Sequence, residues 1–336
     1  METHDPETPS VPPTWPIGDP QPPEASPPIA VQESDPLPLP VPGNPFLSHV
    51  RELFDMIKFE HTVFALPFAL LGALGAAQGL PPLRTGLWIL VAMVGARTAA
   101  MTFNRLVDVD VDVENPRTAS RALPAGRVSQ AGAMVLMGAG ILLFGLAAGA
   151  LGPLTWALSP LALVIILGYS LCKRFTAWAH VVLGLSLSGA PLGAWIAVAG
   201  HIEAPALWLS AGVLTWTAGF DILYSLQDES FDRSKGLHSI PSKLGTRGAL
   251  WLSRGLHLVA LLCWGMFNHQ MGSHLWPWAG WGLVAAMLAR EQWLVRDGDL
   301  SRIDQAFFTL NSLIGLVFFA GHALEYWLSR TLLAPL

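Results

Sequence analysis

The sequence predicts an all-α, polytopic membrane protein, a helical bundle with about nine transmembrane helices. Of its 336 residues, 52% are hydrophobic and only 13% are charged, whereas soluble domains carry roughly 25% charged residues. Residues 128–172 contain no charged residue at all. That length fits two consecutive spans, because a helix needs about 20 apolar residues to cross a bilayer.

Residues 1–45 differ in composition from the rest of the chain. They hold 15 of the 27 prolines, and residues 1–44 contain seven acidic residues but no Lys or Arg. Subtracting those seven from the 24 acidic residues leaves 17 against 19 basic ones. We therefore predict a disordered, Pro-rich acidic tail over residues 1–45 and a transmembrane domain over residues 46–336. The tail lacks the basic start and the apolar core of a secretory signal.

Composition also limits the partners and the metals. No basic patch typical of nucleic-acid binding is visible, so we expect no nucleic-acid partner. Cys172 and Cys263 form no CxxC pair, and the ten His residues show no paired spacing, which argues against a zinc site. The tail is either a PxxP ligand or a plain solvated extension, and protein partners stay unknown.

Nine predicted spans follow a short amphipathic surface helix over residues 46–59. We place the spans at residues 61–80, 85–106, 130–150, 153–172, 178–199, 206–227, 249–268, 275–292 and 306–328. Leu151-Gly152-Pro153 separates the third span from the fourth. The polar run Asn268-His269-Gln270 breaks the uncharged stretch after the seventh.

Basic residues mark alternate loops between these spans. With a cytoplasmic N-terminus, the outside loops contain Arg84 and little else. The inside loops carry Arg117, Arg121, Arg127, Lys173, Arg174, Arg233, Lys235, Lys243, Arg247, Arg290, Arg296 and Arg302. Because Lys and Arg accumulate in cytoplasmic loops, we expect an integral protein of a bacterial inner membrane with these loops in the cytoplasm.

Three oxygen-bearing side chains at the end of the second span have four-residue spacing: Asn104, Asp108 and Asp112. Residues four apart share one face of a helix, and carboxylates at a membrane edge usually mark a functional site. Mg²⁺ binds through one or two carboxylates together with substrate phosphates, so we predict a site of that kind. Arg97, seven residues before Asn104, forms either an ion pair with an aspartate or a diphosphate contact. Asp110 points elsewhere and is expected in solvent.

A second acidic stripe follows the sixth span. Asp221, Asp228 and Asp232 are spaced at i, i+7 and i+11, which predicts one helical face, with Tyr224 near it. Because two such stripes lie on the cytoplasmic side, we expect these acidic residues to do more than solvate the ends of helices. The rival class is a transporter of Mg²⁺ or organic ions, but transporters place their polar groups near the middle of the bilayer.

The fourth span ends with Tyr169 and Lys173, which are four residues apart and therefore share a helical face. A phenol and a cation in this position either bind diphosphate oxygens or, in the case of Lys173, only set the topology. Both interpretations stay open.

Together these motifs resemble those of the UbiA superfamily of intramembrane prenyltransferases. The family pattern NxxxDxxxD matches Asn104, Asp108 and Asp112, and its second DxxxD pattern matches Asp228 and Asp232. Residues 121–126, RALPAG, are similar to the RPLPxG motif of the family, and residues 169–176 match as well. Ala122 stands where many members have Pro, and Arg105 replaces a common acid.

Within the superfamily, the chain is most similar to the 4-hydroxybenzoate polyprenyltransferases, including their relatives in the futalosine route to menaquinone. Residues 57–67 and 236–241 carry this similarity. The resemblance implies Mg²⁺-dependent transfer of a polyprenyl group from polyprenyl diphosphate to an aromatic acid in ubiquinone or menaquinone biosynthesis. Dihydroxynaphthoate, homogentisate, haem or a chlorin remain alternative acceptors.

The resemblance also implies a role for each site residue. Two Mg²⁺ ions would be held with the diphosphate by Asn104, Asp108, Asp112, Asp228 and Asp232. The expected diphosphate contacts are Arg121, Lys173, Tyr169 and Arg97. Asp221 is expected to be a further ligand or an acceptor contact, and His61 and Tyr224 are expected to border the aromatic pocket.

Overall fold

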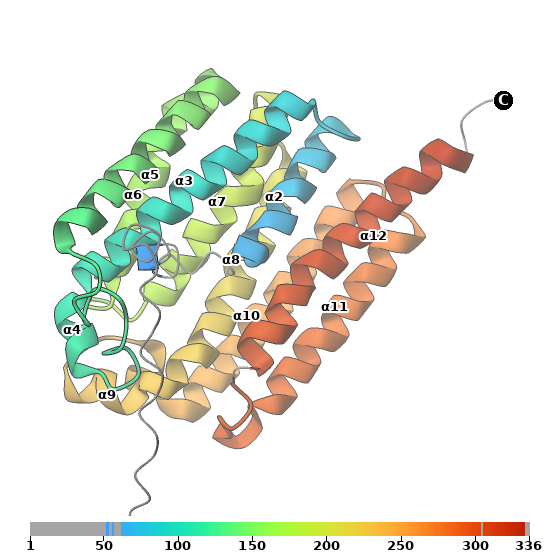
Figure 1. Ribbon diagram of the computed structural model, residues 1–336. Coiled ribbons are helices and arrows are strands. Elements are labelled where there is room, and N and C mark those ends of the chain that lie inside the picture. The colour runs from blue at the N-terminus through green and yellow to red at the C-terminus, as the bar shows by residue number, and fades with distance from the viewer. Residues whose placement is uncertain (1–51, 54–55, 57–61, 304, 333–336) are drawn as a thin grey trace, which may run out of the picture. The chain divides into compact units, whose positions relative to one another are not determined.

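Long helices make up most of this computed structural model, which describes residues 52–53, 56, 62–303 and 305–332 (Figure 1). The described residues contain no strand, so the predicted all-α class is confirmed. The predicted tail and most of the predicted surface helix lie outside the described residues, and so does His61.

Nine helices of 16 to 31 residues occur in the described part of the chain, each overlapping a predicted span. They are α2 (Thr62–Ala77), α3 (Leu83–Val107), α5 (Gln130–Leu151), α6 (Pro153–Cys172), α7 (Ala179–Ala199), α8 (Ala204–Ser225), α10 (Ile240–Gln270), α11 (Leu275–Leu294) and α12 (Asn311–Leu332). The shorter elements are α4 (Val109–Glu114), a 3₁₀ turn (Leu226–Asp228), α9 (Glu229–Ser234), a second 3₁₀ turn (Arg296–Gly298) and a π-helical turn (Gln305–Leu310).

The count of nine spans is not confirmed. Seven described helical segments are long and apolar enough to cross a membrane, namely α3, α5, α6, α7, α8 with its extension, α10 and α12. The apolar part of α2 is shorter, and α11 is not among the seven. Four Trp residues and the adjacent Arg290 and Glu291 reduce the mean hydropathy of α11.

Local sequence signals explain where the helices begin and end. Gly152, with φ of 145°, separates α5 from α6, and Pro153 starts α6, as the sequence predicts. Ser239 caps α10 by accepting a hydrogen bond from the backbone of Ser242. α10 begins nine residues before the predicted span, because the chain stays helical on both sides of a break at Gly245 (φ 68°).

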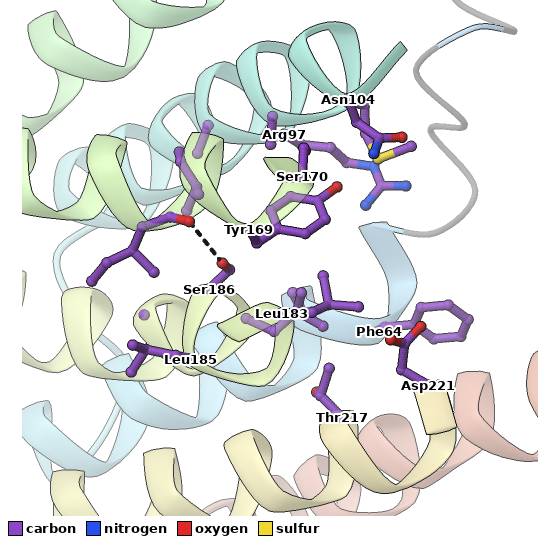
Figure 2. A pocket seen from close by; sticks show the side chains of 18 of the residues that line it. Phe64, Arg97, Asn104, Tyr169, Ser170, Leu183, Leu185, Ser186, Thr217 and Asp221 are labelled. Atoms are coloured by element: carbon purple, nitrogen blue, oxygen red, sulfur yellow. Dashed lines mark hydrogen bonds between the residues drawn. The ribbon is translucent and has the colours of Figure 1, made fainter. Parts of the chain in front are cut away.

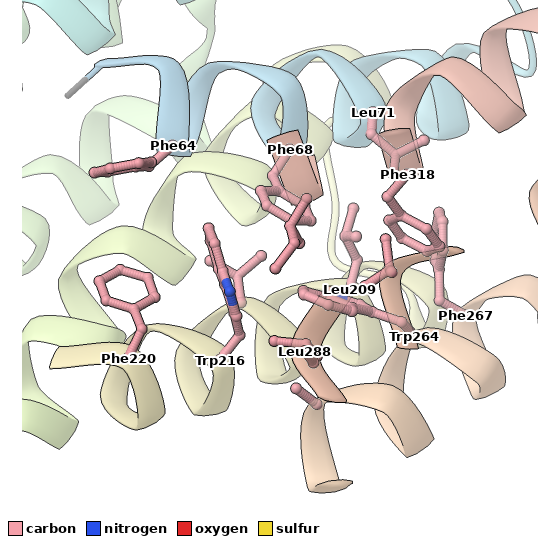
Figure 3. Packing of buried hydrophobic residues seen from close by; sticks show 14 of the residues in the cluster. Phe64, Phe68, Leu71, Leu209, Trp216, Phe220, Trp264, Phe267, Leu288 and Phe318 are labelled. Atoms are coloured by element: carbon pink, nitrogen blue, oxygen red, sulfur yellow. The ribbon is translucent and has the colours of Figure 1, made fainter. Parts of the chain in front are cut away.

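An aromatic core lies among α2, α8, α10 and α12 (Figure 3). Phe68 stacks on Trp264 with ring centroids 5.3 Å apart, and both side chains are fully buried. Trp216 on α8 donates its indole N–H to Asn311 Oδ1 over 2.7 Å, which satisfies the polar end of a buried ring. This packing holds α8 against α2, α10 and α12.

Some glycines of α2 and α7 allow close helix packing, whereas others border open space. A Cβ atom at Gly72 would overlap the Pro191 carbonyl oxygen, and one at Gly184 would overlap the Leu214 carbonyl oxygen. These two glycines allow close helix packing, as small residues do in membranes. Gly189, in contrast, has no atom within 4 Å of an added Cβ.

Replacing Gly72 with Ala is expected to destabilise the fold by about 1–3 kcal/mol, because the methyl group overpacks against α7. Thermal unfolding of the detergent-solubilised protein measures this effect. The matched control is Gly189→Ala, which should keep or slightly raise the melting temperature, since Ala is the better helix former by about 1 kcal/mol. Equal melting temperatures for the two variants would contradict the packing role of Gly72.

Candidate functional site

A cavity of about 1350 Å³ lies among α3, α5, α6, α7 and α8 (Figure 2). Both predicted aspartate clusters line it. Ile89 and Asn104 also line it and are fifteen residues apart on α3, which corresponds to about 22 Å of helix. Away from the acids the wall is apolar, with Phe144, Leu158 and Ile165 among its residues. The cavity is therefore a long apolar space with a polar end.

The first cluster stands where α3 gives way to α4. Asn104 lies in the last turn of α3, Asp108 forms the break (φ −93°, ψ 5°), and Asp112 lies in α4. The Asp112 N–H donates to the Asp108 carbonyl oxygen over 2.7 Å, so the four-residue register survives the break. Asn104 Nδ2 donates to Asp108 Oδ2 over 2.9 Å, and Asp110 is exposed as predicted.

Asp108 experiences opposing influences. Burial raises the pKa of its carboxyl group above the ordinary value, and the neighbouring charge of Asp112 raises it further, while Lys173 and Arg174 act to lower it. A cation bound beside Asp108 would stabilise the ionised form by the same electrostatics.

The second cluster is arranged differently from the prediction of one helical face. α8 ends at Ser225 and tightens into a 3₁₀ turn that contains Asp228, and Asp232 lies on α9. The prediction of a continuous helical stripe is therefore wrong, although Asp221, Asp228 and Asp232 all line the cavity. Asp228 is 8% exposed and Asp232 only 2% exposed.

Two arginines pair with two of the buried carboxylates, Asp112 and Asp228. Arg121 Nη1 lies 2.7 Å from both carboxylate oxygens of Asp112. Arg117 binds Asp228 with two hydrogen bonds, from Nε to Oδ1 at 3.0 Å and from Nη2 to Oδ2 at 2.5 Å. Such paired contacts are strong and geometrically specific. The same guanidinium group lies 5.6 Å from the centre of the Tyr224 ring.

No pattern in the sequence distinguishes Arg117 from the other basic residues of its loop. It shares a loop with Arg127, which instead forms an ion pair with Glu52. Both arginines follow the positive-inside pattern equally well. Only the fold tells them apart, because the partner of Arg117 lies 111 residues further along the chain.

The residues at this end fit Mg²⁺ that arrives with a phosphate ligand. Among the described residues, no three His, Cys, Asp or Glu side chains are grouped closely enough to hold a metal ion by themselves. Carboxylate and amide oxygens are nevertheless suitable donors, since Mg²⁺ commonly uses one or two carboxylates and completes its shell with phosphate and water. Oδ2 of Asp232 is buried and has no hydrogen-bond partner in the described structure.

The predicted phosphate-binding side chains also face the cavity. Lys173 follows the end of α6, Tyr169 lies one turn earlier, and both line the wall. Arg97 on α3 lines it as well, and Figure 2 shows its side chain on the same side of the cavity as Tyr169 and Asn104. The structure thus brings these residues together, and their roles stay predictions.

A third group of side chains lines the cavity wall formed by α2, α8 and the π-helical turn. Tyr224 stacks on Phe307 with ring centroids 4.0 Å apart, and Phe64 lines the same wall beside Asp221 (Figure 2). Behind Asp221, His180 on α7 brings its Nδ1 to 2.6 Å from Asp221 Oδ2. The sequence interpretation missed His180, which lies in an apolar segment without a motif.

Comparison with known sequences assigns these features to one family. Residues 65–313 match the UbiA prenyltransferase family. The 4-hydroxybenzoate octaprenyltransferase of Idiomarina loihiensis is 32% identical over 261 residues, which cover 75% of this chain and 88% of the relative. The enzyme of the same name from Pseudomonas fluorescens is 35% identical over 258 residues, covering 75% and 84%.

Solved structures share the fold. The apo structure of a UbiA homolog from Aeropyrum pernix K1 has a TM-score of 0.73 at 34% identity, covering 80% of this chain and 98% of that chain. A UbiA homolog from Archaeoglobus fulgidus, bound to DMAPP and Mg²⁺, has a TM-score of 0.65 at 19% identity, covering 81% and 98%. This chain is therefore an integral membrane prenyltransferase that belongs to the UbiA prenyltransferase family.

Proposed function

We propose that this protein transfers a polyprenyl group from polyprenyl diphosphate to an aromatic acid resembling 4-hydroxybenzoate, in ubiquinone or menaquinone biosynthesis. One observation carries the proposal: two acidic clusters and several cations line the polar end of a cavity that continues as a long apolar space. A prenyl diphosphate has the same division into an anionic head and an apolar chain. The names of the curated relatives support the acceptor class.

The polar end is the proposed binding site for the diphosphate. Asn104, Asp108, Asp112, Asp228 and Asp232 would hold two Mg²⁺ ions together with the diphosphate. When bound, Mg²⁺ neutralises charge on the leaving group. Arg121, Lys173, Tyr169 and Arg97 line the same end and would bind and orient the diphosphate oxygens.

The chemistry requires a polar donor site beside a water-poor acceptor site. The C1–O bond of the donor breaks and its electron pair leaves with the diphosphate, where Lys173 and Arg121 stabilise the developing charge. A π electron pair of the aromatic ring forms the new bond to C1. The ring carbon then loses its proton to the released diphosphate, and aromaticity returns. Phe64, Tyr224 and Phe307 wall this region with aromatic surface and limit attack by water.

The aromatic walls do not by themselves select one acceptor, because such walls accept many ring systems. Asp221 and Tyr224 provide the polar contacts near those walls, and His61 remains a predicted neighbour outside the described residues. Dihydroxynaphthoate, homogentisate, haem and a chlorin are the alternatives to 4-hydroxybenzoate. Assaying the purified protein with labelled prenyl diphosphate against this panel tests the assignment. The transporter interpretation loses its support, since the family is one of prenyltransferases.

We place the polar end on the cytoplasmic side of a bacterial inner membrane. Arg117, Arg121, Lys173 and Arg174 all line the polar end of the cavity, and basic residues accumulate in cytoplasmic loops. We also propose that residues 46–336 form the catalytic domain. The acidic tail of residues 1–45 is not needed for the reaction in this proposal.

Asp112→Asn and Asp228→Asn are each expected to lower Mg²⁺-dependent prenyl transfer by at least 100-fold, because an amide keeps the shape but loses the charge that attracts the cation. Transfer of labelled prenyl diphosphate to 4-hydroxybenzoate in the presence of Mg²⁺ measures this. Asp110→Asn is the matched control, since Asp110 belongs to the same segment but is exposed. Near-normal transfer by either site variant would rule out the metal assignment.

Gly193→Phe is expected to discriminate between donors by chain length. Gly193 lines the cavity, and no atom lies within 4 Å of an added Cβ, so a phenyl ring there occupies space meant for the prenyl chain. The ratio of kcat/KM for a long polyprenyl donor to that for geranyl diphosphate should fall about tenfold. Gly138→Phe, on an exposed helical glycine outside the cavity lining, should leave the ratio unchanged. Parallel losses for both donors would show that the chain takes another path.

A further inference from the structure

His180 and Asp221 form a close pair at the edge of the cavity. His180 is fully buried at the start of α7, whereas Asp221 on α8 has a side chain that is 21% exposed. Only Asp221 of the two lines the cavity. His180 Nδ1 lies 2.6 Å from Asp221 Oδ2, so the imidazole stands directly behind the carboxylate.

The second ring nitrogen of His180 fixes the direction of that hydrogen bond. Ile240 donates its backbone N–H to His180 Nε2 over 3.3 Å. A nitrogen that accepts a hydrogen bond carries no proton, so the proton of the neutral ring resides on Nδ1. His180 therefore donates to Asp221, and Asp221 accepts through Oδ2. The described structure gives Oδ1 of Asp221 no hydrogen-bond partner.

The Ile240 N–H that bonds to the ring is held in place by the backbone of α10. It belongs to the first turn of α10, where the backbone N–H groups lack partners within the helix. The loop just before it is anchored as well, because His238 donates its N–H to the carbonyl oxygen of Lys173 over 2.8 Å. The ring orientation is thus set by the same segment that contacts the end of α6.

We propose that His180 is a positioning residue for the prenyl acceptor: it fixes the rotamer of Asp221 so that the other carboxylate oxygen is presented to the acceptor in the cavity. This inference rests on the proposed function. A carboxylate oxygen held there accepts a hydrogen bond from the acceptor hydroxyl, which raises the electron density of the ring that attacks C1. His180 does not touch either substrate and acts only through Asp221.

The first experiment compares His180→Leu with His180→Gln in the full-length protein, using 4-hydroxybenzoate and a labelled prenyl diphosphate. Leu has similar volume but no hydrogen-bonding atoms, whereas Gln supplies an N–H for Asp221 and an oxygen for Ile240. The expected result for His180→Leu is at least a tenfold fall in kcat/KM for the acceptor, with the donor KM within twofold of wild type. His180→Gln should recover to within about threefold of wild type.

A double-mutant test separates positioning from a general effect on the fold. Adding His180→Leu to Asp221→Ala should cause no further loss, because the residue that His180 positions is already gone. His322→Leu is a matched control, since His322 is a buried histidine that bonds to Asn268 outside the cavity lining. It should change the melting temperature without a selective loss of acceptor kcat/KM. If His180→Leu does not fold, His180→Phe takes its place and keeps the planar ring.

The outcomes are distinguishable. Wild-type protein that prenylates no acceptor overturns the proposed function, and this inference with it. An active wild type with an unchanged Leu variant overturns only the role of His180. A Gln variant as impaired as the Leu variant, a parallel rise in donor KM, or an additive double mutant also overturns it, since each would show that His180 acts through the fold rather than through Asp221.

Discussion

The ion pair between Arg117 and Asp228 is the contact on which the site depends. It joins the loop after α4 to the 3₁₀ turn after α8, two segments that are 111 residues apart in sequence. A buried carboxylate without a partner costs several kcal/mol, so the acidic clusters cannot face each other unless cations lie between them. Arg117 and Arg121 supply those cations from one loop. The charges that we propose bind a metal and a diphosphate therefore also hold the two halves of the polar end together.

One side of α8 packs into a tight aromatic core, whereas its other side borders the cavity. The aromatic core around Phe68, Trp216 and Trp264 fills the region between α2, α8 and α10, and dense packing of this kind is barely compressible. The other side of α8 borders the cavity. α8 thus carries fully buried side chains on one face and Asp221 on the other, so this candidate site residue lies on the most buried of the seven described helical segments that are long enough to span a membrane.

The sequence predicted the helices well because apolar length and charge distribution are local signals. The predicted span at residues 153–172 has the same first and last residues as α6. The start of α10 was predicted too late, because the amphipathic residues before Gly245 are helical although they lie outside the apolar stretch. Four-residue spacing correctly grouped Asn104, Asp108 and Asp112, since their register is set within one segment. Arg117 and His180 could not be found in this way. Their partners are distant in sequence, and a loop arginine or a histidine in an apolar run has no pattern that reveals its neighbour.

The length of the cavity has a consequence for how the reaction is measured. Its apolar part is lined by residues of helices that are long and apolar enough to span a bilayer, so the proposed long-chain donor would reach the protein from the membrane and not from water. The concentration that governs its binding is then the mole fraction of donor among the lipids. Diluting the protein with extra lipid would slow the reaction even when the bulk concentration stays constant. An aromatic acid, which dissolves in water, would show no such surface dilution.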